Sequence, residues 1–234
     1  MEKLILIPAR YGSSRFPGKP LAKINGKEMI LHVCGGCSKT GYDMYVVTDD
    51  ERISNVVTNA GYKSLIIEGD YITGSDRVSE AAKIFNHEII INVQGDEPLV
   101  DYRDIIKLAE KCESREGYLV FNMYTQSNYE ENDNTIKVVT YKKRLLYMSR
   151  SKIPFKGTVI KKQVGMYAFP RSVLREFYGK NSFESPSEIM EGVEILRALD
   201  FYGDVFMIET KNNYQAVDTP EDIKKVEDIL NGIW

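Results

Sequence analysis

The chain alternates short apolar runs with longer segments in which apolar and charged residues are mixed. Short runs rich in Val and Ile predict buried strands, whereas apolar residues spaced three and four apart predict helices that cover a sheet. In the first half, strands are predicted at residues 4–7, 44–47, 63–67, 88–93 and 118–124. Helices are predicted between them at residues 28–39, 51–60, 73–85 and 101–113. This alternation indicates an α/β fold with a mostly parallel central sheet and helices on both faces.

The second half has a different pattern. Strand-like residues 135–140 and 145–150 flank a short basic turn and predict a hairpin. Residues 126–134 are polar and predict a loop, and residues 151–162, which contain Pro154 and Gly157, predict an excursion from the main body. Two further strands are predicted at residues 163–169 and 206–209. We therefore expect a single domain over residues 1–234 that carries a hairpin and an extended arm.

Two more helices are predicted after these strands. On a helix over residues 187–199, the acids Glu188, Glu191 and Glu194 are spaced by three and share one face, which we expect to be solvated. The last helix begins near Thr219, which fits the N-cap position, with Pro220 first and Asp222 third in the helix. This cap leaves Asp218, one residue earlier, free to point elsewhere.

A loop rich in glycine, serine and proline follows the first strand and carries the cations Arg10, Arg15 and Lys19. Cations beside exposed backbone N–H groups form a nest for an anion such as a polyphosphate. The alternative is a solvated basic turn. Because ligands collect where the strands of an α/β sheet end, the position favours a nucleotide site. The loop has neither the P-loop pattern nor the glycine pattern of dinucleotide-binding folds, which excludes both classes.

Acidic residues follow the buried strand at residues 88–93, in the motif Gln94-Gly95-Asp96-Glu97-Pro98. Asp96 is the candidate ligand for Mg²⁺, which takes one or two carboxylates and completes its coordination with phosphate and water. The alternative is a turn in which Asp96 is a cap. Asp218 is the candidate second carboxylate. Two acids, one Mg²⁺ and a triphosphate together are the components of a nucleotidyl-transfer site.

The helix predicted at residues 73–85 opens with Thr73-Gly74-Ser75-Asp76-Arg77. We expect Ser75 or Asp76 to be its N-cap. Arg77 lies in the first turn, where a cation opposes the helix dipole. This mismatch suggests that Arg77 faces an anion.

The composition is that of an ordinary globular protein, with 43% hydrophobic and 28% charged residues. The net charge of −3 and the absence of a basic tail argue against nucleic acid as a partner. No apolar run reaches the roughly 18 residues of a membrane span, and no signal peptide is visible, so we expect no membrane insertion. Three cysteines fit a reducing compartment, and we expect a cytoplasmic protein.

Cys34 and Cys37 form a C-x-x-C motif inside the first predicted helix. A zinc site would need further ligands, and the only other candidates are the distant Cys112 and His87. A redox pair would need a thioredoxin-like strand-to-helix context. We therefore expect packing cysteines, with metal or redox chemistry as the alternative.

The motifs together closely resemble those of the 3-deoxy-manno-octulosonate (Kdo) cytidylyltransferases, the CMP-Kdo synthetases. The resemblance begins with I-P-A-R-Y-G-S-S-R-F-P-G-K-P-L at residues 7–21 and continues through N-V-Q-G-D-E-P-L at residues 92–99. It spans nearly the whole chain in the same order. The other matching motifs are V-T-D-D (47–50), T-G-S-D-R (73–77), N-T-I-K-V-V (134–139), L-Y-M-S-R-S-K-I-P (146–154) and V-D-T-P-E-D (217–222).

This resemblance implies a nucleotide-diphospho-sugar-transferase-like fold and a homodimer formed through an arm near residues 145–165. It also implies that the anomeric hydroxyl of Kdo attacks the α-phosphate of CTP, giving CMP-Kdo and pyrophosphate for lipopolysaccharide or capsule synthesis. No general base is evident, and metal coordination that lowers the pKa of the hydroxyl is the simpler hypothesis. The implied nucleotide-binding residues are Pro8, Ala9, Arg10, Arg15, Lys19, Ser75 and Gln94. The implied Mg²⁺ ligands are Asp96 and Asp218, which with Lys19 and Arg10 form the catalytic set. The implied acceptor-binding residues are Arg77, Gln163, Tyr167 and Glu194.

Two departures from the family pattern concern the acceptor. The family's R-H-I-G-I-Y-A is K-Q-V-G-M-Y-A here, so that Gln163 replaces a histidine. The family's L-E-Q-L-R is V-E-I-L-R here, so that Ile195 replaces a glutamine. A site built to hydrogen-bond particular hydroxyls discriminates strongly when these partners change. The acceptor is therefore open between Kdo and a modified acceptor: 8-amino-Kdo, another 2-keto-3-deoxy sugar acid or a phosphonate. The non-enzymatic alternative is a nucleotide-binding protein without turnover.

Overall fold

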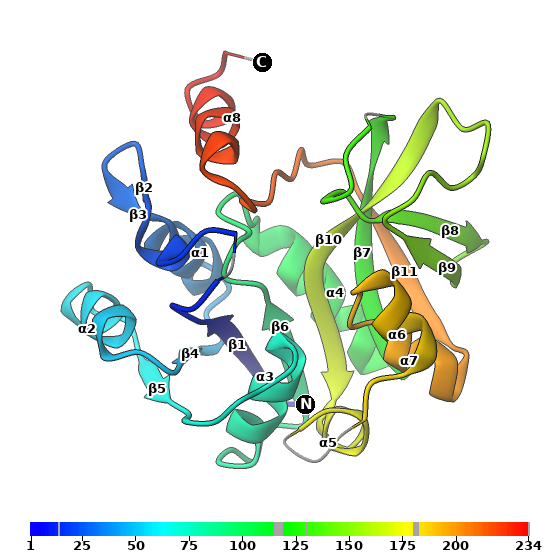
Figure 1. Ribbon diagram of the computed structural model, residues 1–234. Coiled ribbons are helices and arrows are strands. Elements are labelled where there is room, and N and C mark those ends of the chain that lie inside the picture. Colours follow the sequence, from blue (N-terminus) through cyan, green and yellow to red (C-terminus); the bar gives the residue numbers. More distant parts are fainter. Residues whose placement is uncertain (14, 115–118, 130, 180–182, 234) are drawn as a thin grey trace.

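The computed structural model describes residues 1–13, 15–114, 119–129, 131–179 and 183–233. Its centre is a nine-stranded sheet with the strand order β5-β4-β1-β6-β10-β7-β11-β9-β8 (Figure 1). The strands are β1 (Lys3–Ala9), β4 (Asp43–Thr48), β5 (Ser64–Ile66), β6 (Ile89–Val93), β7 (Val120–Asn128), β8 (Lys137–Tyr141), β9 (Arg144–Ser149), β10 (Val159–Pro170) and β11 (Val205–Thr210). A small hairpin of β2 (Lys23–Ile24) and β3 (Lys27–Glu28) precedes the first α-helix.

The sheet is parallel in its first half and mixed in its second. β5, β4, β1 and β6 run parallel to one another. β10 enters antiparallel between β6 and β7, and β11 is parallel to β7. Because β1 and β6 end at the same edge, the residues that follow Ala9 and Val93 are brought together. The predicted parallel α/β arrangement with an added hairpin is confirmed.

Helices cover both faces of the sheet, as the sequence predicts. One face packs against helices that contribute Val33, Ile53 and Ile105, and the other packs against helices that contribute Val78 and Leu174. The helices are α1 (Met29–Ser38), α2 (Glu51–Asn59), α3 (Gly74–Ala82), α4 (Tyr102–Ser114), α5 (Arg171–Phe177), α6 (Pro186–Glu191), α7 (Leu196–Tyr202) and α8 (Pro220–Leu230), with a short 3-10 helix η1 (Lys19–Leu21). No helix in the described ranges is long and apolar enough to cross a membrane.

The C-x-x-C motif lies in α1, and its two cysteines are buried in the core. Between them, a Cβ added at Gly36 would stand 2.5 Å from the carbonyl oxygen of Val100. Glycine at this position therefore lets α1 approach the segment before α4. Burial raises the pKa of the Cys34 thiol to about 12, which disfavours the thiolate that metal binding and redox chemistry need. The packing interpretation fits this environment.

The prediction of one helix over residues 187–199 is wrong. α6 ends at Gly192, which adopts a left-handed conformation (φ 60°), and α7 begins only at Leu196. The expected solvated acidic face is also wrong, because Glu188 and Glu194 point inward. Glu188 is 2% exposed and pairs with the fully buried Arg197 at 2.7 Å. Arg197 also pairs with Asp76 of α3 at 2.7 Å, so that one guanidinium joins α3, α6 and α7.

Several boundaries also differ from the prediction. β10 begins at Val159, within the segment expected to leave the main body, because it pairs there with β7. For the same reason β7 continues to Asn128, into the expected loop. The N-cap of α3 is Thr73 rather than Ser75 or Asp76: its hydroxyl accepts from the Asp76 backbone, while its own N–H donates to the Asp76 carboxylate. The hairpin of β8 and β9 is confirmed.

Candidate active site

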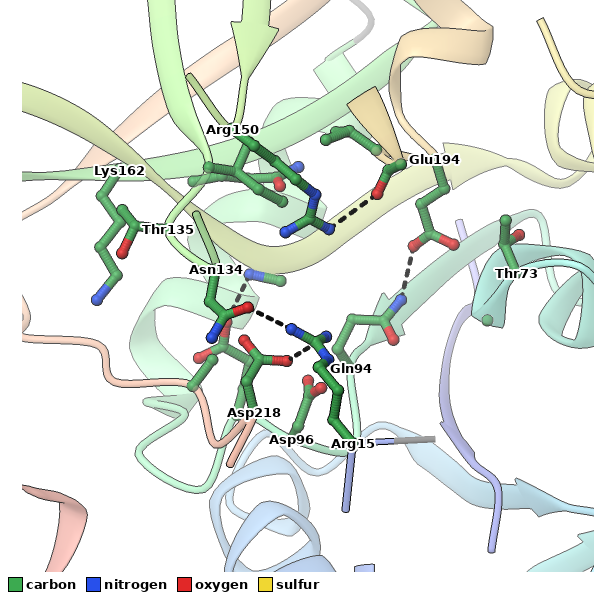
Figure 2. Close-up of a pocket in the computed structure, with 18 of the residues that line it drawn as sticks. Arg15, Thr73, Gln94, Asp96, Asn134, Thr135, Arg150, Lys162, Glu194 and Asp218 are labelled. Atoms are coloured by element: carbon green, nitrogen blue, oxygen red, sulfur yellow. Dashed lines mark hydrogen bonds and ion pairs between the residues drawn. The ribbon is translucent and has the colours of Figure 1, made fainter. Parts of the chain in front are cut away.

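Two adjoining cavities open where β1 and β6 end. The larger has a volume of about 370 Å³ and the smaller about 200 Å³. They share a boundary that includes Arg15, Gln94, Asp96 and Asp218. In Figure 2, Arg15 points toward Asp218, with Asp96 beside them, and Gln94 points toward Glu194. The molecule can therefore hold two ligands that meet at one acidic edge.

The smaller cavity contains most of the predicted nucleotide-binding residues, which come from β1, the loop after it and the end of β6. They are Pro8, Ala9, Arg10, Arg15, Lys19 and Gln94. A Cβ at Gly95 would stand 2.7 Å from the carbonyl oxygen of Pro8. Only glycine allows the β6 loop to approach the end of β1 this closely. The cations of the loop and Gln94 consequently line one cavity.

Lys19 brings the two predicted metal ligands together. Its ammonium lies 2.6 Å from a carboxylate oxygen of Asp96 and 3.9 Å from one of Asp218. Arg15 pairs with Asp218 at 2.9 Å and also donates to Asn134. Burial and the nearby negative charge of Asp96 raise the pKa of Asp218, while the charges of Lys19 and Arg15 oppose this shift.

Asp218 is held in place by a small apolar cluster that follows from the sequence around it. Val217 is buried with Ile24, Met29 and Val226, and this cluster fastens α8 to the β2–β3 hairpin. The Val217 backbone donates to the Asp96 carbonyl at 3.0 Å. The cap of α8 uses the backbones of Asp218 and Thr219, which donate to the Asp222 carboxylate, and the Asp218 side chain lines both cavities.

The two carboxylates fit a magnesium ion bound together with a phosphate ligand. Within the described residues, no group of three or more His, Cys, Asp or Glu side chains forms a metal cage. Mg²⁺ does not require one, because it is held by one or two carboxylates with phosphate and water. The convergence of Asp96 and Asp218 on one ammonium provides such a pair and already places a positive charge beside it.

Glu97 is a buried acid that the sequence analysis did not assign to the site, although it follows Asp96 directly. One carboxylate oxygen accepts from the Gly165 backbone at 2.8 Å, and the other has no hydrogen-bond partner in the described structure. Burial, with the charge of Asp96, raises the pKa of Glu97 to about 7. Glu97 lines the larger cavity and is a further acidic side chain there.

The larger cavity contains three of the four predicted acceptor-binding residues, Gln163, Tyr167 and Glu194. Glu194 accepts from the Gln94 side chain at 2.7 Å and from the Ser75 backbone at 3.1 Å (Figure 2). Burial raises the pKa of Glu194 to about 7. Glu194 therefore links the wall of one cavity to the wall of the other.

Three residues lie elsewhere than expected. Arg77, expected on the acceptor side, lines the smaller cavity, and the anion that it faces is Asp49, at 2.7 Å. Ser75 lines neither cavity. Its hydroxyl oxygen accepts a hydrogen bond from the buried Asn92 side chain. Ile195 is fully buried in the core and does not line the acceptor side. Of the two departures from the family pattern, only Gln163 therefore lines the larger cavity.

Two cations at the larger cavity were not assigned by sequence reasoning. The Arg150 guanidinium donates to the carbonyl oxygens of Glu191 and Gly192 at 2.8 and 3.0 Å, and Lys162 donates to the Tyr214 carbonyl at 2.8 Å. Arg150 belongs to the matching motif at residues 146–154, and Lys162 opens the K-Q-V-G-M-Y-A stretch that was compared with the family pattern. Their charges suit an acidic ligand.

Comparisons with known proteins agree with this geometry. A family model described as cytidylyltransferase matches residues 4–226. An 8-amino-3,8-dideoxy-manno-octulosonate cytidylyltransferase of Shewanella pealeana is 40% identical, over 97% of this chain and 98% of that protein. A 3-deoxy-manno-octulosonate cytidylyltransferase of Christiangramia forsetii is 34% identical, over 97% and 96%. The structure of a CMP:2-keto-3-deoxy-manno-octonic acid synthetase complexed with CTP superposes with a TM-score of 0.87 at 32% identity, covering both chains fully.

Proposed function

We propose, since this chain belongs to the cytidylyltransferase family, that it couples CTP to the 2-keto-3-deoxy sugar acid Kdo, giving CMP-Kdo and pyrophosphate. One observation carries the proposal. Most of the predicted nucleotide-binding residues line one cavity and most of the predicted acceptor-binding residues line the other, and the two cavities meet at Asp96 and Asp218, beside Lys19. Nucleotidyl transfer requires two bound substrates and a concentration of charge where they meet. The product is suited to lipopolysaccharide or capsule synthesis.

In this reaction the anomeric hydroxyl oxygen of the sugar acid forms a bond to the α-phosphorus of CTP. The bond between that phosphorus and the bridging oxygen to the β-phosphate breaks, pyrophosphate leaves, and the hydroxyl proton passes to solvent. Arg10, Arg15 and Lys19 face the cavity proposed for CTP and bind its phosphates. Arg150 and Lys162 line the other cavity and offer positive charge to the acceptor carboxylate.

Magnesium is part of the proposal, with Asp96 and Asp218 as its protein ligands. When bound, the ion supplies positive charge to the phosphates and lowers the pKa of a coordinated hydroxyl. Lys19 lies within reach of both carboxylates and orients them in the free protein. Glu194 orients Gln94 at the boundary between the cavities.

A second candidate keeps CTP and changes the acceptor to 8-amino-Kdo. The relatives support this acceptor, because several at 36–40% identity are 8-amino-3,8-dideoxy-manno-octulosonate cytidylyltransferases. Gln163 in place of the family's histidine also concerns the acceptor. Other 2-keto-3-deoxy sugar acids and phosphonates are the remaining candidate acceptors. The non-enzymatic alternative is a nucleotide-binding protein without turnover, and the meeting of Lys19, Asp96 and Asp218 argues against it.

An acceptor panel tests the proposed function. We expect pyrophosphate release that requires CTP, Mg²⁺ and an octulosonate acceptor, measured with Kdo, 8-amino-Kdo, a shorter 2-keto-3-deoxy sugar acid and a phosphonate. Replacing CTP with ATP, GTP or UTP is the control for the donor. Tight CTP binding without pyrophosphate release from any acceptor would contradict the proposal and favour the binding protein.

We further propose that the chain forms a homodimer through residues 145–165 and works in the cytoplasm. Large apolar side chains are exposed in and beside this segment: Phe155 is 81% exposed, Val159 55% and Leu146 51%. Three buried free thiols fit a reducing compartment. Sedimentation equilibrium that returned the mass of a monomer would contradict the dimer.

A further inference from the structure

The strand that carries Gln163 is interrupted after the next residue, Val164. The pairing of β10 with β7 shifts in register between Val164 and Tyr167, so that two β10 residues have no partner across the ladder. Asn122 of β7 is fully buried at this break. Its amide nitrogen donates to the carbonyl oxygens of Val164 and Met166, at 2.9 and 2.8 Å. Asn122 therefore replaces the hydrogen bonds that the bulge removes.

These two bonds determine which way the Asn122 amide faces. Carbonyl oxygens only accept hydrogen bonds, so the atom facing them must be the nitrogen, and the Asn122 oxygen must face the other way. That oxygen lies 3.2 Å from the Gln163 side-chain nitrogen. Because the Asn122 oxygen can only accept, Gln163 must present its nitrogen to it. The same nitrogen lies 3.4 Å from the Tyr167 hydroxyl.

The remaining polar atom of Gln163 is its carbonyl oxygen. Gln163 lines the larger cavity, and its carbonyl oxygen makes no hydrogen bond with the described residues. The bulge thus presents a fixed, uncharged hydrogen-bond acceptor to a ligand. A histidine at this position would be able to donate, accept or carry a charge, whereas the locked amide oxygen only accepts.

The larger cavity offers acidic side chains that suit a cationic donor. Acidic side chains outnumber basic ones among the residues that line it, although Asp96, Asp218 and Glu188 are each paired with a cation. The acids are Asp96, Glu97, Glu184, Glu188, Glu194, Asp218 and Asp222, and the cations are Arg15, Arg150 and Lys162. An ammonium is a donor with no acceptor atom, and its hydrogen bonds are stronger than those of a neutral hydroxyl.

We propose that Gln163, held by Asn122 at the bulge, is a specificity-determining residue that selects an acceptor sugar acid bearing an amino group in place of a hydroxyl. The Gln163 oxygen accepts a hydrogen bond from the ammonium of the acceptor. This inference rests on the proposed cytidylyltransferase function and, within it, adopts the second candidate acceptor, 8-amino-Kdo, in place of Kdo.

The test compares 8-amino-Kdo with Kdo in wild type and in Gln163→Met, which keeps the length of the side chain but removes the acceptor oxygen. In wild type we expect kcat/KM for 8-amino-Kdo to exceed that for Kdo by about tenfold or more. In Gln163→Met this ratio falls toward one, through a higher KM for the amino acceptor, while the KM for CTP changes little. Gln163→His is expected to shift the ratio toward Kdo.

Gln215→Met is the matched control, because Gln215 lines the same cavity and its side-chain nitrogen donates to the Ala216 carbonyl. It should leave the ratio unchanged, and thermal unfolding confirms that all variants are folded. A wild-type preference for Kdo, or an equal ratio in wild type and Gln163→Met, would overturn the inference. No turnover with either acceptor, despite CTP binding, would instead overturn the proposed function.

Discussion

Asp96→Asn is expected to lower kcat/KM for CTP-dependent pyrophosphate release by about a thousandfold or more. Asp96 is one of the two carboxylates that converge on Lys19, at 2.6 Å. An amide keeps the size of the side chain but loses the charge that would hold Mg²⁺ and balance the ammonium. The effect should appear in kcat at saturating CTP, because the charge is required where the two substrates meet. Single-turnover measurement of pyrophosphate release checks this.

Asp50→Asn is the control for this substitution, since Asp50 also follows a parallel strand of the sheet. Its side chain accepts from the Arg52 backbone as the N-cap of α2, and asparagine is an equally good cap. Activity should therefore be unchanged. Full activity in Asp96→Asn would remove Asp96 from the mechanism.

Arg197→Met is expected to reduce the free energy of unfolding by about 3–5 kcal/mol, because it removes the positive charge that two buried acids share. Arg197 is completely buried and pairs with Asp76 and Glu188. Although burial opposes ionisation, Arg197 helps to hold the pKa of Asp76 below its ordinary value. Methionine fills much of the volume but supplies no charge. Urea denaturation at neutral pH measures the loss.

Arg103→Met is the matched control, because Arg103 is 70% exposed and pairs with Asp101 on the surface. Exposed ion pairs contribute little to stability, so this variant should unfold at the same urea concentration as wild type. Equal stability of Arg197→Met and Arg103→Met would show that the buried pairs do not hold α3, α6 and α7 together.

Residues next to the strand ends were predictable from the sequence. Buried strands are marked by apolar runs, and parallel strands bring their ends to one edge, so the grouping of Lys19, Gln94 and Asp96 follows from local pattern. Asp218 was predictable from the cap of α8, since a Thr-Pro start fixes where the helix begins. The division into donor and acceptor residues came from resemblance to the family.

Residues whose partners lie far along the chain were not predictable. The spacing of Glu188, Glu191 and Glu194 suits an exposed helical face, and the sequence does not reveal that Arg197 pulls Glu188 inward. Arg77 was correctly expected to face an anion, but its partner Asp49 comes from another strand end. The bulge at Gln163 depends on Asn122 in a neighbouring strand, a contact that local periodicity does not record.

The ion pair between Arg15 and Asp218 has a consequence for the order of events during synthesis. A ribosome makes the chain from its amino end, and α/β segments begin to fold as they emerge. The loop with Arg15 and Lys19 is therefore in place long before Asp218 is added, and until then Lys19 has only Asp96 beside it. A nascent chain that has already built most of the parallel sheet still lacks the second carboxylate. The proposed magnesium site is therefore complete only after Asp218 has been added.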